Sequence, residues 1–401
     1  MNARLIGIAC AIVASASHAA AQLGGLNPPA GPIQNTGPDL GQVEPRIPVG
    51  PGTTPGGSFS QFTISQPGSY YLTGDLVGVS GRSGIFIESS GVSLDLNGFE
   101  VRGVSGSGSG IVISGFGIDN VRIFNGGVRG WGQTSVSTFN GTGVIVRDLT
   151  VSDGGRDGIG LGLRSLAESC TVNNCAGDGI SSNDSSAILR CVIQQCETGI
   201  SGSNGMLVKD CKVSFCDEDG IRVISGTVDS CDVGNVDRDG IALKFDDGVG
   251  ITADGGVVRN CNVDLARRHG INVENDALVE NNLVTVPVVD GIRCISECRI
   301  RGNTIQAADS GARPANGIRA TGGGNFIENN HIGGFTTGLR VDVARSAIFG
   351  NISSGALTAY NIAASNVVGP VSFGGINFGP INGTSGGAPQ GGGDPRANLA
   401  F

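Results

Sequence analysis

Asp178-Gly179-Ile180 is one copy of a short phrase that returns along the chain. The other copies are Asp157-Gly158-Ile159, Thr198-Gly199-Ile200, Asp219-Gly220-Ile221, Asp239-Gly240-Ile241, His269-Gly270-Ile271, Asp290-Gly291-Ile292, Asn316-Gly317-Ile318 and Thr337-Gly338-Leu339. Successive glycines are 21, 20, 21, 20, 30, 21, 26 and 21 residues apart, so the unit has about 21 residues and two units carry insertions. Self-similarity at a fixed short period predicts a solenoid.

A second phrase lies in each unit and reads Val or Ile, two residues, Cys or Asn, one residue, Val or Ile. Its copies are Ile188/Cys191/Ile193, Val208/Cys211/Val213, Val228/Cys231/Val233, Val258/Cys261/Val263, Val279/Asn282/Val284, Ile300/Asn303/Ile305 and Ile327/Asn330/Ile332. Together with the Gly-Ile run, each unit therefore has three short strands separated by turns. Because Val and Ile dominate and Leu is sparse, we predict an all-β parallel β-helix of about a dozen coils and not a leucine-rich repeat, with rungs about 4.8 Å apart.

The ends of the chain differ in composition from this repeat. Residues 1–21 read as a signal peptide, with Arg4 before an apolar run and small residues at its end. Residues 22–57 are rich in Pro and Gly and read as a linker, and residues 369–401 as a disordered Gly-rich tail. We expect the β-helix over 58–368, with an N-terminal cap at 58–83 that covers the open end of the core.

Composition limits the partners of this chain. The formal charge is -9 and no basic stripe is visible, so we expect no nucleic acid as a partner. After the signal peptide no apolar stretch is long enough to span a bilayer. We therefore expect a monomer that is secreted, periplasmic or held at the cell surface.

With these repeats the chain resembles the right-handed parallel β-helix proteins of the pectin-lyase-like superfamily, in particular secreted bacterial members. The resemblance covers roughly residues 60–350 and rests on the Asn column, the Gly-Ile strand starts and Leu94-Asp95-Leu96-Asn97-Gly98-Phe99. It implies a right-handed coil, a ladder of amide hydrogen bonds along the inward Asn column, and a polysaccharide as ligand. The fold also serves adhesins, so it specifies function weakly.

The resemblance does not extend to a complete enzyme motif. Asp246-Asp247, His269-Gly270 and Arg299-Ile300-Arg301 resemble polygalacturonase elements, but their offsets from the phrase glycines differ, which argues against that mechanism. A pectate-lyase-like mechanism would need outward acids that hold calcium. We therefore expect no cofactor, with calcium as the one candidate, and no other metal, because the chain has no CxxC pair or His cluster.

Cysteines stack in columns when the units are aligned. One column holds Cys170, Cys191, Cys211, Cys231 and Cys261, and a second holds Cys175, Cys196 and Cys216, while Cys294 and Cys298 lie outside both. Five and three residues cannot pair off fully within their columns. This favours buried free thiols, and some disulfides remain the alternative in an exported chain.

The residue before each phrase glycine offers a candidate catalytic group. Most copies have Asp, which is explained by an Asp-Gly turn in which the carboxylate caps backbone N–H groups and Gly takes a positive φ. One copy has His269, and alignment places it between Asp239 and Asp290. An imidazole between two carboxylates is biased toward its charged form and could act as a general acid.

The residue two positions after each phrase glycine should face outward, and several copies have arginine. The cations of this row are Arg222, Arg293, Arg319 and Arg340, and Lys244 lies near it. A solvated face neutralised by nearby acids is the simpler explanation, but stacked arginines also suit an anionic ligand. The insertions near 244–256 and 307–314 are expected to wall the two sides of a groove over this row.

Three functions agree with these patterns. The first is binding of an extended, anionic polysaccharide by Arg222, Lys244, Arg293, Arg319 and Arg340, and it is the one we favour. The second is a polysaccharide lyase or glycoside hydrolase that uses His269, Asp239 and Asp290. The third is a non-catalytic structural or adhesin-like surface protein.

Overall fold

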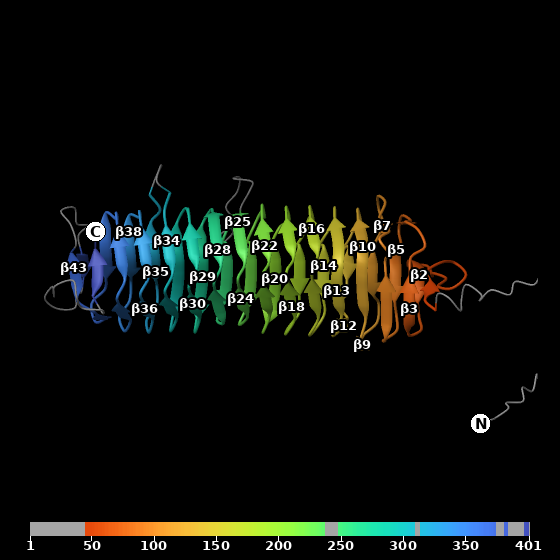
Figure 1. Ribbon diagram of the computed structural model, residues 1–401, viewed down its shortest axis with the longest axis horizontal. Coiled ribbons are helices and arrows are strands. Elements are labelled where there is room, and N and C mark those ends of the chain that lie inside the picture. The colour runs from red at the N-terminus through yellow and green to blue at the C-terminus, as the bar shows by residue number, and fades with distance from the viewer. Residues whose placement is uncertain (1–44, 237–247, 309–312, 374–380, 384–396, 401) are drawn as a thin grey trace, which may run out of the picture. The chain divides into compact units, whose positions relative to one another are not determined.

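The computed structural model describes residues 45–236, 248–308, 313–373, 381–383 and 397–400, and every regular element in them is a β-strand (Figure 1). The chain divides into a short unit, Met1–Pro45, and one compact unit, Arg46–Phe401. The second unit is an elongated solenoid in which the strands of successive coils pair in parallel. The described residues contain no helix that is long and apolar enough to cross a membrane.

The first face of the solenoid is a sheet of 15 strands, one from each rung. The prediction of a parallel β-helix is thus confirmed, with a few more coils than the dozen expected, because less regular coils at both ends also add strands. In order, the strands of the first face are β2 (Ser60–Ile64), β5 (Ser83–Ile87), β8 (Ile111–Ile113), β11 (Val136–Ser137), β14 (Ile159–Leu161), β17 (Ile180–Ser182), β20 (Ile200–Asn204), β23 (Ile221–Ile224), β26 (Ile251–Asp254), β29 (His269–Asn275), β32 (Asp290–Ser296), β35 (Asn316–Ala320), β38 (Thr337–Val341), β41 (Thr358–Ile362) and β44 (Ile381–Gly383).

The other two faces form one folded sheet of 28 strands. The second face has β1 (Ile47–Pro48), β3 (Gly68–Tyr71), β6 (Val92–Asp95), β10 (Arg122–Arg129), β13 (Ile145–Ser152), β15 (Leu166–Glu168), β18 (Ala187–Leu189), β21 (Leu207–Lys209), β24 (Thr227–Asp229), β27 (Val257–Arg259), β30 (Leu278–Glu280), β33 (Arg299–Arg301), β36 (Phe326–Glu328), β39 (Ala347–Phe349) and β42 (Val367–Val368). The third face continues from β10 and β13 and has β4 (Leu76–Val77), β7 (Glu100–Arg102), β16 (Thr171–Asn173), β19 (Val192–Gln194), β22 (Lys212–Ser214), β25 (Asp232–Val236), β28 (Asn262–Ala266), β31 (Leu283–Thr285), β34 (Thr304–Gln306), β37 (His331–Gly333), β40 (Ile352–Ser354), β43 (Val371–Phe373) and β45 (Asn398–Ala400). A separate pair, β9 (Ile118–Asp119) and β12 (Gly141–Thr142), completes the strands of the described residues.

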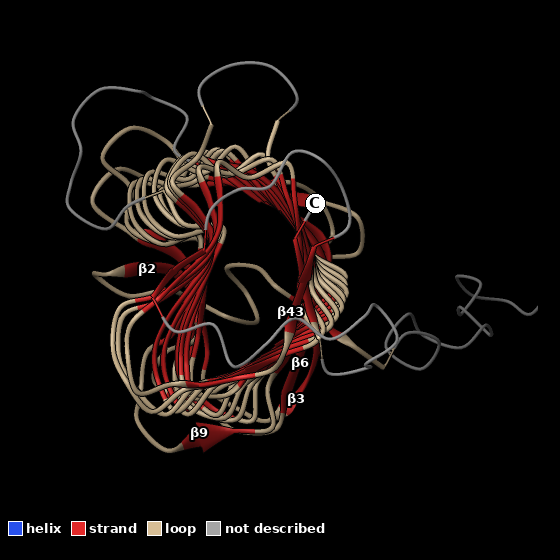
Figure 2. Cartoon of the chain, turned by 90° about the vertical axis from the view of Figure 1, so that its left-hand side faces the viewer, coloured by secondary structure: helices blue, strands red, loops and turns tan. Residues whose placement is uncertain are grey.

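Figure 2 looks along the coil axis and shows these strands superimposed, rung upon rung, in three faces. Inward Val and Ile side chains fill the interior, and the isoleucine of each phrase copy that the structure describes is fully buried. Each such side chain contributes roughly 1.5–3 kcal/mol by leaving water. The repeated phrase therefore supplies one buried isoleucine per rung to a continuous core.

The glycine of the phrase is required by lack of space. A Cβ at Gly179 would lie 2.3 Å from Ile193 Cγ2 and 2.7 Å from the carbonyl oxygen of Gly199. None of the phrase glycines in the described residues has a positive φ, so the expected Asp-Gly turn with a left-handed glycine is wrong. The left-handed residues lie instead at the corners, for example Asn174 and Ser185.

The rung between β23 and β29 is formed by a different copy of the phrase from the one that the sequence alignment selects. Ile221 pairs with Ile251, and Ile251 pairs with Ile271. Gly250-Ile251 therefore occupies the place expected for Gly240-Ile241, and Asp239 and Lys244 lie outside the described residues. Both insertions consequently precede a strand of the first face in the chain, whereas the expected groove needed one of them to follow its strand, and residues 237–247 and 309–312 themselves lie outside the described residues.

Strands lie on both sides of the boundaries 58 and 368 that the sequence indicates. At the N-terminal end Ile47 pairs with Tyr70 of β3. At the C-terminal end Leu399 of β45 pairs with Ile352 of β40, and Asn398 is fully buried. Residues 1–44, which include the expected signal peptide and most of the expected linker, lie outside the described residues.

An asparagine ladder runs along the corner between the second and third faces, as the resemblance implies. Asn282 donates from Nδ2 to Asn303 Oδ1 at 3.0 Å, Asn303 to Asn330 at 2.9 Å, Asn330 to Asn351 at 2.9 Å and Asn351 to Asn398 at 3.1 Å. On the other side Asn282 Oδ1 accepts the backbone N–H of Cys261 at 2.9 Å. The amides thus satisfy backbone groups that the corner leaves without partners.

The cysteines of the described residues are all buried free thiols. The structure thereby agrees with the free-thiol alternative. Burial raises the pKa of the Cys216 thiol to about 12. A thiol that stays protonated is a poor nucleophile, so Cys216 acts as small apolar filling.

Candidate functional site

The residues that precede the phrase glycines line the corner between the third and first faces. Asp157 Oδ1 accepts the backbone N–H of Asp178 at 3.3 Å, and Asp219 Oδ1 accepts that of Val249 at 3.1 Å. These carboxylates cap backbone N–H groups of the next rung, which confirms the capping role expected for them, although the phrase glycines are not left-handed. Burial raises the pKa of both Asp178 and Asp219.

His269, Asp290 and Asn316 follow one another on three rungs of this corner. His269 Nδ1 lies 3.3 Å from Asp290 Oδ2, and Asn316 Nδ2 donates to Asp290 Oδ1 at 2.6 Å. His269 is 4% exposed and Asp290 is 0% exposed. Burial alone would raise the pKa of Asp290, but the adjacent His269 imidazole and the hydrogen bond from Asn316 outweigh it, and the pKa is lowered.

The neighbour of His269 on the other side is Val249, because Gly250 occupies that rung. Among the described residues the imidazole therefore faces one carboxylate, and Val249 stands on the rung where Asp239 was expected. Asp239, the other expected member, lies outside the described residues. The pair is almost completely buried, and His269 Nδ1 and Asp290 Oδ2 have no hydrogen-bond partner among the described residues, so each of these two atoms has the other as its nearest counterpart of opposite charge.

Stability should depend on pH through Asp290. Because its folded-state pKa is lowered, the stability that it supplies is present above its unfolded pKa, near pH 4, and is lost as pH falls through the folded value. We expect Asp290→Asn to lower the free energy of unfolding by about 1–3 kcal/mol at pH 7. In urea titrations the gap to wild type should close below about pH 4.

The control for this experiment is Asp276→Asn, which removes an exposed carboxylate. That variant should unfold with wild type at every pH. The raised pKa values of Asp178 and Asp219 are common to all three proteins, so they cancel in the comparison. A gap for Asp290→Asn that stays constant from pH 7 to pH 3 would contradict the expected role.

Arginines form a row on the outward side of the first face. Arg293 pairs with Arg319, and Arg319 pairs with Arg340, so the three occupy equivalent positions on β32, β35 and β38. Arg319 Nε and Arg340 Nε both donate to Asp342, at 3.1 Å and 2.6 Å. Arg293 Nη1 donates to Asn272 Oδ1 at 3.0 Å and makes no ion pair with any described residue. We call Arg293, Arg319 and Arg340 the arginine row.

Arg222 is not part of this row. Thr252 and Asn272 occupy the two rungs between it and Arg293. Its Nε donates to Asp219 Oδ2 at 3.0 Å, and Glu218 lies 3.9 Å from its Nη2. The structure therefore assigns Arg222 to an acidic corner. Lys244, expected near the row, lies outside the described residues.

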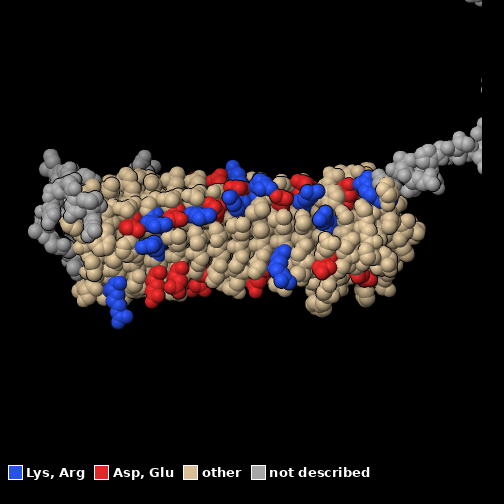
Figure 3. All heavy atoms as spheres, turned by 60° about the horizontal axis from the view of Figure 1, so that its bottom comes forward, with Lys and Arg blue, Asp and Glu red and all other residues tan. Residues whose placement is uncertain are grey.

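The second face carries a row of charged residues whose signs alternate, and this row was not predicted from the sequence. Partnered positions on five successive rungs alternate in sign, and Figure 3 shows blue and red alternating along such a stripe. These positions are Asp229, Arg259, Glu280, Arg301 and Glu328. Arg259 Nη2 lies 3.1 Å from Asp229 Oδ2, and Arg301 Nη2 lies 2.6 Å from Glu280 Oε2. We call this set the alternating ladder.

The arginine row thus places like charges on three adjacent rungs of the first face, whereas the alternating ladder of the second face places opposite charges on adjacent rungs. Rungs are about 4.8 Å apart, so the guanidinium groups repel one another. Asp342 is the one carboxylate within ion-pair distance of the row among the described residues. The contact of Asp342 with the row could have been predicted from its spacing, because a residue two positions after Arg340 faces the same side of the strand.

Comparison with known families agrees with this architecture. Residues 74–205, 164–305 and 198–349 match the family model described as "Right handed beta helix region", and together these matches span well over half of the chain. The chain belongs to the right-handed beta helix family. No match is found among curated protein sequences.

Several solved structures resemble this β-helix protein at low identity. The A-module of the Azotobacter vinelandii mannuronan C-5 epimerase AlgE6 is 14% identical with a TM-score of 0.46, over 73% of this chain and 80% of that one. The AlgE4 A-module of the same organism is 15% identical with a TM-score of 0.41, over 70% and 91%. The catalytic domain of a GH87 alpha-1,3-glucanase is 15% identical with a TM-score of 0.44, over 70% and 64%. Similarity at this level assigns no activity to the β-helix protein.

Proposed function

We propose that this β-helix protein is exported and binds an extended, anionic polysaccharide along the first face, at the cell surface or outside the cell. The observation that carries the proposal is the arginine row: three guanidinium groups at partnered positions with one carboxylate between them. A guanidinium group presents a planar fork of donors that matches a carboxylate or sulfate. A ligand with regularly spaced anions would relieve the repulsion between the guanidinium groups of the arginine row. The alternating ladder needs no such ligand, because its charges pair with one another.

Arg293→Gln should weaken this binding. Arg293 has no carboxylate partner among the described residues, so its removal leaves no unpaired acid behind. Loss of one partly exposed charged contact is worth about 1 kcal/mol, which corresponds to a roughly five-fold increase in Kd. Affinity for polygalacturonate and alginate, measured at low salt and again at high salt, checks this, and Arg319→Ala should act in the same direction.

The control is Arg122→Ala, which removes an exposed arginine of β10 on another face and changes the net charge equally. Its affinity should stay at the wild-type value. If Arg293→Gln, Arg319→Ala and Arg122→Ala all behave alike, non-specific charge explains the binding and the proposal fails. Absence of any affinity of the wild-type protein for either polyuronate has the same meaning.

The second candidate is a polysaccharide lyase or hydrolase, and the observation that favours it is the His269–Asp290 pair beside the arginine row. The same polyuronates, incubated with and without calcium, would then release unsaturated or reducing ends that His269→Ala abolishes. If the wild-type protein releases no ends, the binding function stands alone.

A further inference from the structure

Bulky apolar residues adopt a strained backbone at one corner of the solenoid. At the corner after the third face most described rungs place Gly, Asn, Asp or Gln in the left-handed region, for example Gly130, Asp153, Asn174, Gln195 and Asn235. Glycine adopts this conformation without strain, and Asn and Asp are enriched there. Three rungs instead place Phe215, Leu265 and Val286 there, with φ of 59°, 53° and 51°. This conformation costs an ordinary residue about 1–2 kcal/mol. Because the same turn forms elsewhere with Asn or Gln, the fold does not require these residues.

These side chains border two adjoining hollows on the third face. One, of about 370 Å³, is lined by Phe215, Asn235, Val236, Leu265, Val286 and Val288, among others. The other, of about 340 Å³, is lined by Gln194, Lys212, Ser214, Phe215, Asp232, Asn262 and Asp264, among others. Phe215 and Asn235 line both, so the apolar and polar hollows meet at the Phe215 ring, which is 44% exposed.

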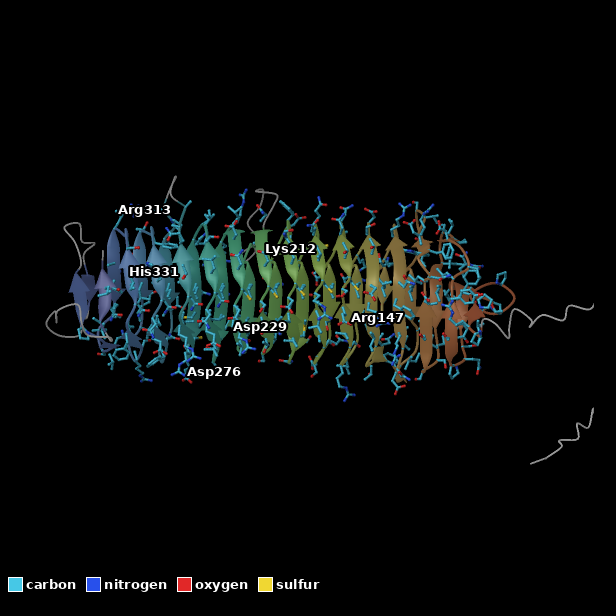
Figure 4. The ribbon with its side chains drawn as sticks, viewed as in Figure 1. Arg147, Lys212, Asp229, Asp276, Arg313 and His331 are labelled. Atoms are coloured by element: carbon cyan, nitrogen blue, oxygen red, sulfur yellow. The ribbon has the colours of Figure 1, made fainter. Side chains whose placement is uncertain are left out.

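The polar hollow is lined by one hydrogen-bonding group that has no partner in the protein and by one exposed ion pair. The Ser214 hydroxyl is buried and has no hydrogen-bond partner. Lys212, which Figure 4 shows on the near side of the solenoid, lies 3.8 Å from Asp232, and both side chains are largely exposed. Gly234 contributes to the hollow because its equivalents Ser214 and Asp264 have side chains and it has none.

An exposed aromatic ring beside amide, hydroxyl, ammonium and carboxylate groups suits a sugar. The apolar face of a sugar ring packs on an aromatic face, while its hydroxyl groups both donate and accept hydrogen bonds. Lys212 is offset by Asp232, and Arg267 of the apolar hollow offsets Asp264, so the two hollows together carry no net charge and suit an uncharged saccharide. We propose that the surface around Phe215, Ser214 and Gly234 is a second carbohydrate site that binds an uncharged hexose oligosaccharide.

This site lies on the third face and is independent of the arginine row on the first. The probes are cellohexaose, maltohexaose and mannohexaose, titrated calorimetrically into the full chain. We expect at least one to bind, and Phe215→Asn to weaken that binding at least ten-fold. The same substitution should leave the unfolding temperature equal or higher, because Asn suits the left-handed conformation. A side chain that served only stability would lower it.

Gly234→Gln provides a second test that does not touch the aromatic ring. A Cβ at Gly234 would have its nearest contact at 3.4 Å, from Asp264 O, and Gln194 and Gln306 occupy equivalent positions on other rungs, so the fold should accept the change. The added side chain should fill the polar hollow and weaken binding of the same hexasaccharide by a similar factor. The control is Phe116→Asn, because Phe116 is a 91% exposed phenylalanine remote in sequence from this corner.

Two results would overturn this inference. One is that none of the three hexasaccharides binds the wild-type protein, and the other is that Phe215→Asn and Gly234→Gln bind as wild type does. Retention of polygalacturonate or alginate by Phe215→Asn separates this site from the arginine row. Either proposal can therefore fail while the other holds.

Discussion

Asn303→Leu should lower the free energy of unfolding by about 3–5 kcal/mol, the largest effect that we expect from one polar side chain. Asn303 Nδ2 donates to Val279 O at 3.0 Å, and its Oδ1 accepts from Asn282 N at 3.0 Å. Leucine matches the asparagine in size but leaves that N–H and that C=O buried without partners. Each unsatisfied group costs about 1–3 kcal/mol, and the amide contacts to Asn282 and Asn330 are also lost.

Urea titration followed by circular dichroism measures this effect. Cys231→Ala is the control, because it removes a buried side chain from the same corner column and orphans no backbone group that an amide satisfies. We expect that variant to lose only about 1 kcal/mol, through the small cavity. If Asn303→Leu is no more destabilising than Cys231→Ala, the ladder contributes volume and not hydrogen bonds.

Gly291→Ala should destabilise the protein by about 2–4 kcal/mol although it adds a single methyl group. The new Cβ would lie 2.2 Å from Ile305 Cγ2 and 2.5 Å from Gly317 O. The second contact is to backbone of the next rung, so a rotamer change cannot relieve it, and the rungs must separate locally. Overpacking of a filled core typically costs about 1–3 kcal/mol, and strain on the backbone hydrogen bonds between the rungs adds to this cost.

Gly234→Ala is the matched control for this substitution. Its Cβ would meet Asp264 O at an ordinary 3.4 Å, and Gly234 lies in a strand, where alanine loses less conformational entropy than glycine on folding. We expect its thermal midpoint to equal or exceed that of wild type. Equal midpoints for Gly291→Ala and Gly234→Ala would show that the phrase glycine is not fixed by lack of space.

The fold was predictable because stacking converts a period in sequence into a column in space. Asn282, Asn303 and Asn330 share one offset within their units, and they do form one ladder. His269 and Asp290 were paired for the same reason. An intact period therefore yields neighbours across rungs without any knowledge of the side-chain packing.

The period is insufficient where an insertion lies between two copies of the phrase. Gly240-Ile241 and Gly250-Ile251 are ten residues apart, so either glycine divides the interval from Gly220 to Gly270 into one spacing of 20 residues and one of 30. Asp239 made the first copy resemble its neighbours, whereas Val249 precedes the glycine that pairs in the sheet. Choosing the first copy therefore placed the Asp239 carboxylate next to His269, whereas the described residues place Val249 there.

The surface of the solenoid was less predictable than its core. The positions of Asp342 and of the alternating ladder follow from the strand register. Their electrostatic effect, however, depends on which charged side chains are in contact. Phe215 belongs to neither phrase, and its backbone conformation is visible only in the structure. Outward residues are not constrained by a common interior, so a repeat predicts their position and not their role.

The alternating ladder also restricts how such a chain can change in length. Removing the coil that carries Arg259 would bring Asp229 next to Glu280, two carboxylates on adjacent rungs. Removing the coils of both Arg259 and Glu280 would bring Asp229 next to Arg301 and keep opposite signs together. Along this stretch, opposite charges stay on adjacent rungs only if an even number of coils is lost or duplicated. The uncharged cysteine column imposes no such restriction on the number of coils.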